Sequence, residues 1–74
     1  MMTTEEQKKT EEFADKIKEA NFSFDTAFMC GTLAFCKENR VRTIELLDKF
    51  IELIDKYPDE REFVAEACSA AGVD

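Results

Sequence analysis

The feature that most constrains this chain is an almost uncharged stretch between residues 22 and 36. It holds four of the seven phenylalanines of the 74-residue chain and a single formal charge, Asp25. At the 100° per residue of an α-helix, its apolar and small side chains spread over nearly the whole circumference. A helix of that kind is either central in a bundle or covered by another chain. The stretch therefore predicts a central helix with one surface suited to a partner.

The two sides of this stretch are predicted to have different roles. One broad helical face is assigned to the core, and it consists of Phe24, Ala27, Phe28, Cys30, Gly31, Ala34 and Phe35. The side chains of Met29, Leu33 and Cys36 fall on the opposite face. Because glycine costs about 1 kcal/mol relative to alanine inside a helix, Gly31 is expected where another helix passes close.

Local signals place the first two helices. Thr3 or Thr4, followed three residues later by Glu6 or Gln7, has the pattern of a capping box, which predicts a helix over 4–20. Asn21 suits the left-handed conformation that ends a helix. Ser23 or Asp25 then caps a second helix that runs over 25–38.

The second half of the chain carries equally clear signals. Thr43 is predicted to cap a third helix over 43–57, in which apolar side chains occupy about half the circumference and charged ones the other half. Pro58 stops this helix, and Asp59 caps a fourth one over 60–71. The chain is thus predicted to be a single all-α domain, residues 1–74, built as a small bundle of four short helices.

The second and third helices are expected to form the central pair of this bundle. The predicted core consists of Phe13, Ile17, Phe24, Phe28, Ala34, Phe35, Ile44, Leu47, Phe50, Ile51, Ile54, Phe63 and Ala67. Because Phe28 is assigned to this core, Phe28→Ala should cost about 3–5 kcal/mol, enough to unfold a chain this short.

Charge and composition argue against several functional classes. Seventeen acidic and ten basic residues give a net charge of −7, which disfavours binding to nucleic acid or to an anionic membrane. The chain has no histidine or tryptophan, no glycine-rich phosphate loop and no metal-ligand spacing. Three cysteines without histidine do not make a four-ligand zinc site. We therefore expect no enzyme, no cofactor and no metal.

The remaining signals suggest a cytoplasmic location. The first twenty residues are dense in charge, unlike a signal peptide, and the longest weakly polar run, residues 27–36, is too short to span a bilayer. An odd set of three cysteines is read most simply as reduced thiols, with Cys36 the one beside a basic residue, Lys37.

The predicted function is protein–protein interaction by a small acidic helical module, a regulator or adaptor. The predicted interaction surface consists of Met29, Leu33, Cys36, Leu46, Leu53 and Tyr57, which a single neighbouring helix does not cover. A two-fold homodimer would bury this surface, and another protein is a further candidate partner. Two alternatives stay open: the first and fourth helices cover this surface within one chain, or the protein is an acidic mimic of nucleic acid that occupies a basic site.

Overall fold

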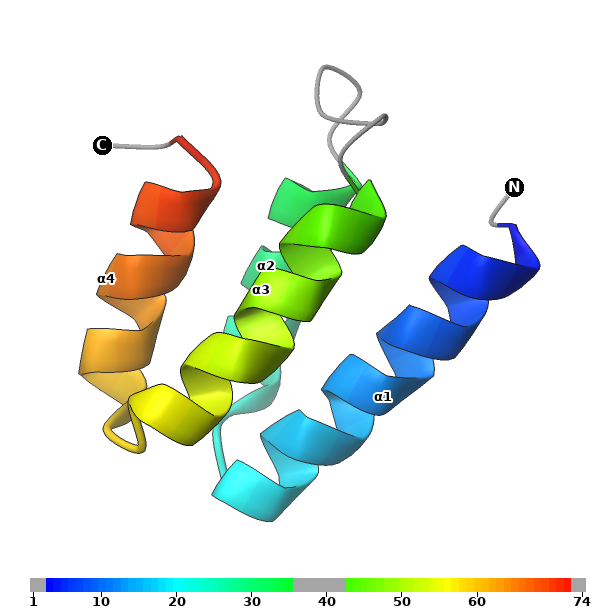
Figure 1. The fold of residues 1–74 in the computed structure, drawn as a ribbon. Coiled ribbons are helices and arrows are strands. Elements are labelled where there is room, and N and C mark those ends of the chain that lie inside the picture. The colour runs from blue at the N-terminus through cyan, green and yellow to red at the C-terminus, as the bar shows by residue number, and fades with distance from the viewer. Residues whose placement is uncertain (1–2, 36–42, 73–74) are drawn as a thin grey trace.

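A computed structural model of the protein describes residues 3–35 and 43–72. These residues form four helices and no strand: α1 (Thr4–Ala20), α2 (Phe24–Ala34), α3 (Thr43–Lys56) and α4 (Glu60–Ala70) (Figure 1). The predicted all-α fold with four short helices is confirmed. The predicted bounds agree closely with these, except that α2 ends at Ala34, before the predicted end at 38; positions 36–38 lie outside the described residues.

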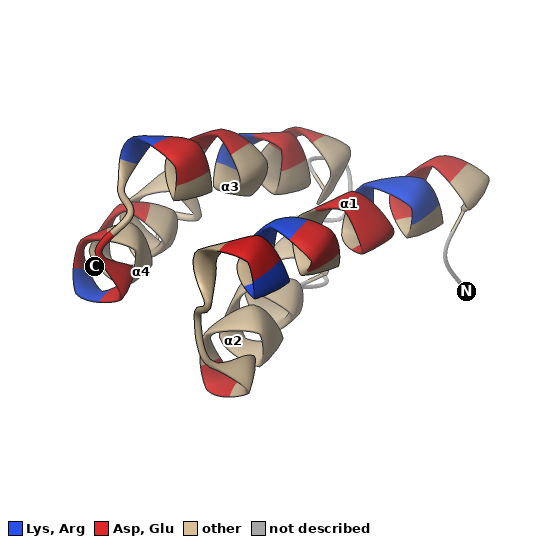
Figure 2. Cartoon of the chain, turned by 90° about the horizontal axis from the view of Figure 1, so that it is seen from below, with Lys and Arg blue, Asp and Glu red and all other residues tan. Residues whose placement is uncertain are grey.

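Successive helices run in opposite directions, so that α1 and α3 are parallel to each other and antiparallel to α2 and α4 (Figure 1). Among the described residues, α2 and α3 each contact all the other helices, whereas α1 and α4 do not contact each other. Figure 2 shows α3 and α2 on opposite sides of the bundle, with α4 and α1 at its two flanks. The prediction that the second and third helices form the central pair agrees with these contacts for α3, whereas α2 buries only Thr26, Cys30 and Ala34.

The helix ends follow the local sequence signals. The Thr3 hydroxyl accepts a hydrogen bond from the Glu6 amide at 3.1 Å, and the Glu6 carboxylate accepts one from the Thr3 amide at 3.0 Å. This reciprocal pair is the predicted capping box. Asn21 ends α1 in the left-handed conformation with φ 61°, and Asp59 caps α4 by accepting from the Arg61 and Glu62 amides. Thr43 is the first residue of α3, so the position that caps this helix lies outside the described residues.

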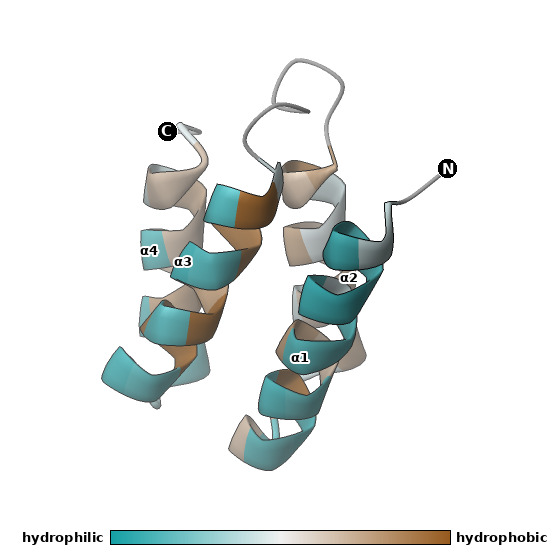
Figure 3. Cartoon of the chain, turned by 45° about the vertical axis from the view of Figure 1, so that its right-hand side comes forward, coloured by the Kyte–Doolittle hydropathy of each residue, from teal (hydrophilic) through white to brown (hydrophobic). Residues whose placement is uncertain are grey.

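The hydrophobic core is built mainly on α3. Figure 3 shows the hydrophobic side of this helix turned into the bundle and its hydrophilic side turned outward. The aromatic ring of Phe50 is fully buried, and its centroid lies 5.9 Å from that of Phe13 on α1. The ring centroid of Phe22 lies 5.3 Å from the ring centroid of Phe63 on α4. The buried apolar residues are Phe13, Ile17, Cys30, Ala34, Leu46, Leu47, Phe50, Leu53, Ile54, Phe63 and Ala67.

The predicted core residues are buried on α1 and α4, and so are Leu47, Phe50 and Ile54 on α3, whereas on α2 only Ala34 is. The predicted residues Ile44 and Ile51 are partly buried. Three predicted core phenylalanines are instead exposed: Phe24 by 81%, Phe28 by 69% and Phe35 by 37%. The helix is thus rotated relative to the prediction, and the large rings lie on its outer side.

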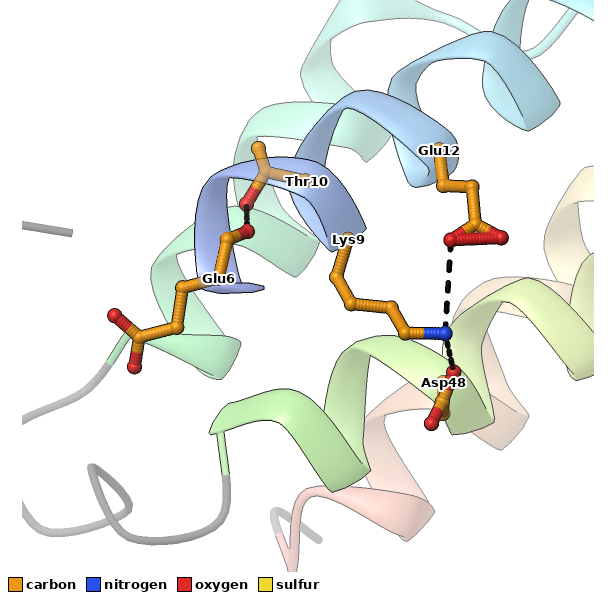
Figure 4. A network of polar contacts seen from close by, with 5 residues as sticks. All are labelled: Glu6, Lys9, Thr10, Glu12 and Asp48. Atoms are coloured by element: carbon orange, nitrogen blue, oxygen red, sulfur yellow. Dashed lines mark hydrogen bonds and ion pairs between the residues drawn. The ribbon is translucent and has the colours of Figure 1, made fainter. Parts of the chain in front are cut away.

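Two ion pairs join the parallel helices α1 and α3. Lys9 pairs with Asp48, and Lys16 pairs with Asp55 at 3.0 Å. In each helix the two members are seven residues apart, which is two helical turns, so the pairs repeat along the contact. Figure 4 shows Lys9 of α1 reaching both Glu12 of its own helix and Asp48 of α3. The hydrogen bonds to Asp48 and Asp55 raise the pKa values of Lys9 and Lys16.

Candidate interaction surface

The inner face of α2 carries small side chains. Thr26, Cys30 and Ala34 are buried, and because they are four residues apart they lie along one line of the helix. Small residues at such a contact let two helices approach closely, and α2 contacts all three of its neighbours. This arrangement leaves no room on the inner face for the phenylalanine rings.

A hydrogen-bonded cluster fixes the beginning of α2 against α4. The Glu60 carboxylate accepts hydrogen bonds from the Ser23 amide and the Ser23 hydroxyl, each at 2.9 Å, and from the Thr26 hydroxyl. The bonds from Thr26 and Ser23 lower the pKa of Glu60. The Ser23 hydroxyl also accepts from the Thr26 amide as the N-cap of α2. A negative charge beside the positive end of the helix dipole is favourable, so Glu60 acts as a second, external cap.

A second hydrogen bond fixes the end of α2 against α3. The hydroxyl of Thr43, which is 1% exposed, donates to the carbonyl oxygen of Ala34 at 2.8 Å. This carbonyl belongs to the last turn of α2, where helix carbonyls lack partners within their own helix. With Glu60 at one end and Thr43 at the other, both ends of α2 are held by polar groups of other helices.

These two contacts hold the Thr26 side chain against α4 and the Ala34 carbonyl against α3. Thr26 and Ala34 face inward, so residues about 130° away around the helix face outward. That outer line consists of Phe24, Phe28, Gly31 and Phe35, which we call the aromatic stripe. Its members are four, three and four residues apart, the spacing of a helix–helix contact seam. This spacing is visible in the sequence and is the signal that could have identified the stripe as a contact surface.

The aromatic stripe borders an open apolar groove of about 420 Å³. Ala27 and Thr32 of α2 and Thr10 of α1 complete its lining. The Thr10 hydroxyl donates to the carbonyl oxygen of Glu6 in its own helix at 2.8 Å (Figure 4). A Cβ atom placed on Gly31 would meet nothing within 4 Å. The prediction that another helix of the bundle passes close to Gly31 is therefore wrong, and the glycine instead leaves space in the groove.

The predicted interaction residues do not form one exposed patch. Leu46 and Leu53 are buried in the core, while Met29, Leu33 and Tyr57 are partly buried against it. Cys36 lies outside the described residues. Leu46 and Leu53 are covered because α1, α2 and α4 all contact α3. For Leu46 and Leu53 the structure therefore agrees with the alternative expectation, in which helices of the same chain cover these side chains.

The buried cysteine, Cys30, is a poor candidate for chemistry. Cys30 is fully buried, and burial raises the pKa of its thiol to about 12. A thiol with such a pKa forms very little of the reactive thiolate near neutral pH. Cys68 is partly buried on α4. Within residues 3–35 and 43–72, no three histidine, cysteine, aspartate or glutamate side chains are grouped to hold a metal ion.

Comparisons with protein families, with curated proteins and with solved structures give no match. None of the helices in the described parts of the chain has the length and hydropathy needed to cross a membrane. The aromatic stripe is therefore a candidate surface because of its geometry. It is a row of exposed rings on a helix that hydrogen bonds hold at both ends.

Proposed function

We propose that this protein is a non-enzymatic protein–protein interaction module, a small regulator or adaptor, and that the aromatic stripe on α2 is its docking surface. The observation that carries the proposal is the exposure of Phe24, Phe28 and Phe35 along one line of a helix. Together they expose the equivalent of nearly two whole side chains, or about 300–450 Å² of apolar surface. A patch of this size is comparable with the largest on ordinary monomers, which is often functional.

The position of the rings adds to this argument. Exposed phenylalanines contribute little to the stability of the chain, because burial is what makes an aromatic side chain stabilising. The bundle buries the small residues of α2 and leaves the large ones in water, the reverse of what stability alone favours. A helix of another molecule laid along the groove would bury the rings, in the recognition mode in which an amphipathic helix fills an apolar groove.

The charged surface supports this proposal over the acidic mimic. Figure 2 shows acidic and basic residues interleaved along α1 and α3. Two of the four acids on the exposed side of α3, Asp48 and Asp55, are paired with lysines of α1. A mimic of nucleic acid needs an uninterrupted row of carboxylates, and these pairs interrupt it.

The test uses two variants that add the same charge at different exposed positions. Phe28→Asp places a carboxylate in the stripe, and Ala65→Asp places one on the exposed side of α4. We expect the parent and Ala65→Asp to retain a protein partner, which includes a second copy of the chain, and Phe28→Asp to lose it while staying helical by circular dichroism. Retention should not weaken as salt is added, since the contact is apolar.

The proposal is refuted if folded Phe28→Asp keeps the same partner as the parent, or if the parent binds nothing. Binding that survives Phe28→Asp but weakens steeply with salt would favour the acidic mimic instead.

A further inference from the structure

We infer that the occupant of the aromatic stripe is a second copy of this chain, docked with its α2 antiparallel to the first around a two-fold axis. This inference rests on the proposed function and names the partner of the same surface. It differs from the dimer expected from the sequence, whose surface included the buried residues Leu46 and Leu53.

The spacing of the stripe makes it complementary to itself. Intervals of four, three and four residues are the same read from either end of the helix, so two antiparallel copies keep all four positions in register. A two-fold axis between positions 28 and 31 sets Phe24 against Phe35 of the second copy. The same axis sets Phe28 against Gly31 of the second copy, and this contact occurs twice, as an isologous interface requires.

The shape of the groove fits this pairing. Phe28 projects from the surface with 69% of its area exposed, and the space beside Gly31 is open because a Cβ there would meet nothing within 4 Å. A large side chain on one helix can therefore enter the space left by glycine on the other. This is the knob-into-hole contact on which packed helix pairs are built.

The charge distribution permits the contact despite the acidity of the chain. Each copy carries a net charge of −7, which opposes association. The only charged residue of α2 is Asp25, in its first turn, so α2 itself brings a single acidic group from each copy to the contact. Salt screens repulsion between the two copies without weakening the apolar contact. Self-association should therefore tighten as salt is added, whereas binding to a basic partner should weaken.

The area indicates a weak dimer. Rings from two copies would bury about 600–900 Å², to which Ala27 and Thr32 add a little, and this lies below the 1,200–2,000 Å² of standard interfaces. The dimer should therefore form and dissociate within a concentration range of about 5–500 µM, which sedimentation equilibrium covers.

A pair of exchanged residues tests the register. Phe28→Gly removes the projecting ring, and Gly31→Phe fills the space that receives it, so each single variant should weaken the dimer by about tenfold or more. The double variant, Phe28→Gly with Gly31→Phe, has the same composition as the parent and restores the same contact with the roles of the two positions exchanged. Its dissociation constant should return to within about threefold of that of the parent.

Each outcome of this experiment decides a specific point. A parent that stays monomeric over the whole range refutes self-pairing, and the proposed function then stands only if Phe28→Asp abolishes binding to some other protein. A dimer that Phe28→Gly leaves unchanged refutes this surface. A Gly31→Phe variant that dimerises more tightly indicates parallel helices and overturns the antiparallel register, as does a helical double variant that fails to recover. Ala65→Asp, remote from the stripe, should dimerise like the parent.

Discussion

Truncation of two phenylalanines separates the core from the aromatic stripe. Phe50 is fully buried against Phe13, so Phe50→Ala should cost about 3–5 kcal/mol. At about 0.05–0.15 kcal/mol per residue, a chain of 74 residues has about 4–11 kcal/mol of stability in total. Phe50→Ala should therefore remove between about a quarter and all of it.

The same change at Phe28 should have a small effect. About a third of this side chain is buried, so its truncation forfeits about 1 kcal/mol of burial, and alanine returns about 0.5 kcal/mol through its higher helix propensity. The net loss should stay below about 1 kcal/mol, a shift in Tm of no more than about 4–8 °C. For Phe50→Ala the drop in Tm should be at least about 12 °C.

The measurement is thermal unfolding followed by far-ultraviolet circular dichroism. Dilute samples are needed, because a dimer that forms through the stripe would make Tm depend on concentration. Phe63→Ala, at a second fully buried ring, is the matched control and should behave like Phe50→Ala. If Phe28→Ala in dilute solution loses as much stability as these two variants, the rings of α2 lie in the core and the orientation of the helix described above is wrong.

Three further predictions concern Gly31, Glu60 and Cys30. Gly31→Ala should stabilise the dilute protein by about 0.5–1 kcal/mol, since the added methyl meets nothing and alanine is the better helix former; an unchanged or lower Tm would contradict this. The lowered pKa of Glu60 means that its stabilising effect is complete above the ordinary value of 4.5 and is lost as the pH falls through the lower folded value. Urea unfolding should thus show Glu60→Gln less stable than the parent near neutral pH, with a difference that shrinks in acid; a difference independent of pH would argue against the carboxylate as the acceptor. With its pKa near 12, the Cys30 thiol should resist alkylation in the native protein and react on unfolding, as mass spectrometry can show; native labelling of Cys30 as fast as Cys68 would refute its burial.

The sequence by itself determined most of the helix ends, although not the end of α2. Thr3 with Glu6, Asn21 and Asp59 all act where they were predicted to act. These interactions join residues two to five positions apart, so a short stretch of sequence is enough to predict them. The wet half of α3 was equally predictable, because its charged side chains face water. Which residues of the apolar half lie deepest was not, since Leu46 and Leu53, assigned to the interaction surface, are buried.

The orientation of α2 was not available from local pattern. Apart from Asp25 the helix has no charged residue to mark its wet side, so periodicity allowed several rotations, and the largest rings were assigned to the core. The rotation is fixed by Glu60, which is 37 residues from Ser23, and by Thr43, nine residues beyond Ala34. These partners meet only when the bundle has formed.

The salt bridges between α1 and α3 also depend on the tertiary structure. Lys9 and Lys16 of α1 pair with Asp48 and Asp55 on α3. A neighbouring helix supplies carboxylates that no local pattern reveals. The helix caps and the two faces of α3 follow from residues close together in the sequence. The aromatic stripe faces outward in the folded chain, where hydrogen bonds with Glu60 and Thr43 hold α2 with its small side chains against the core.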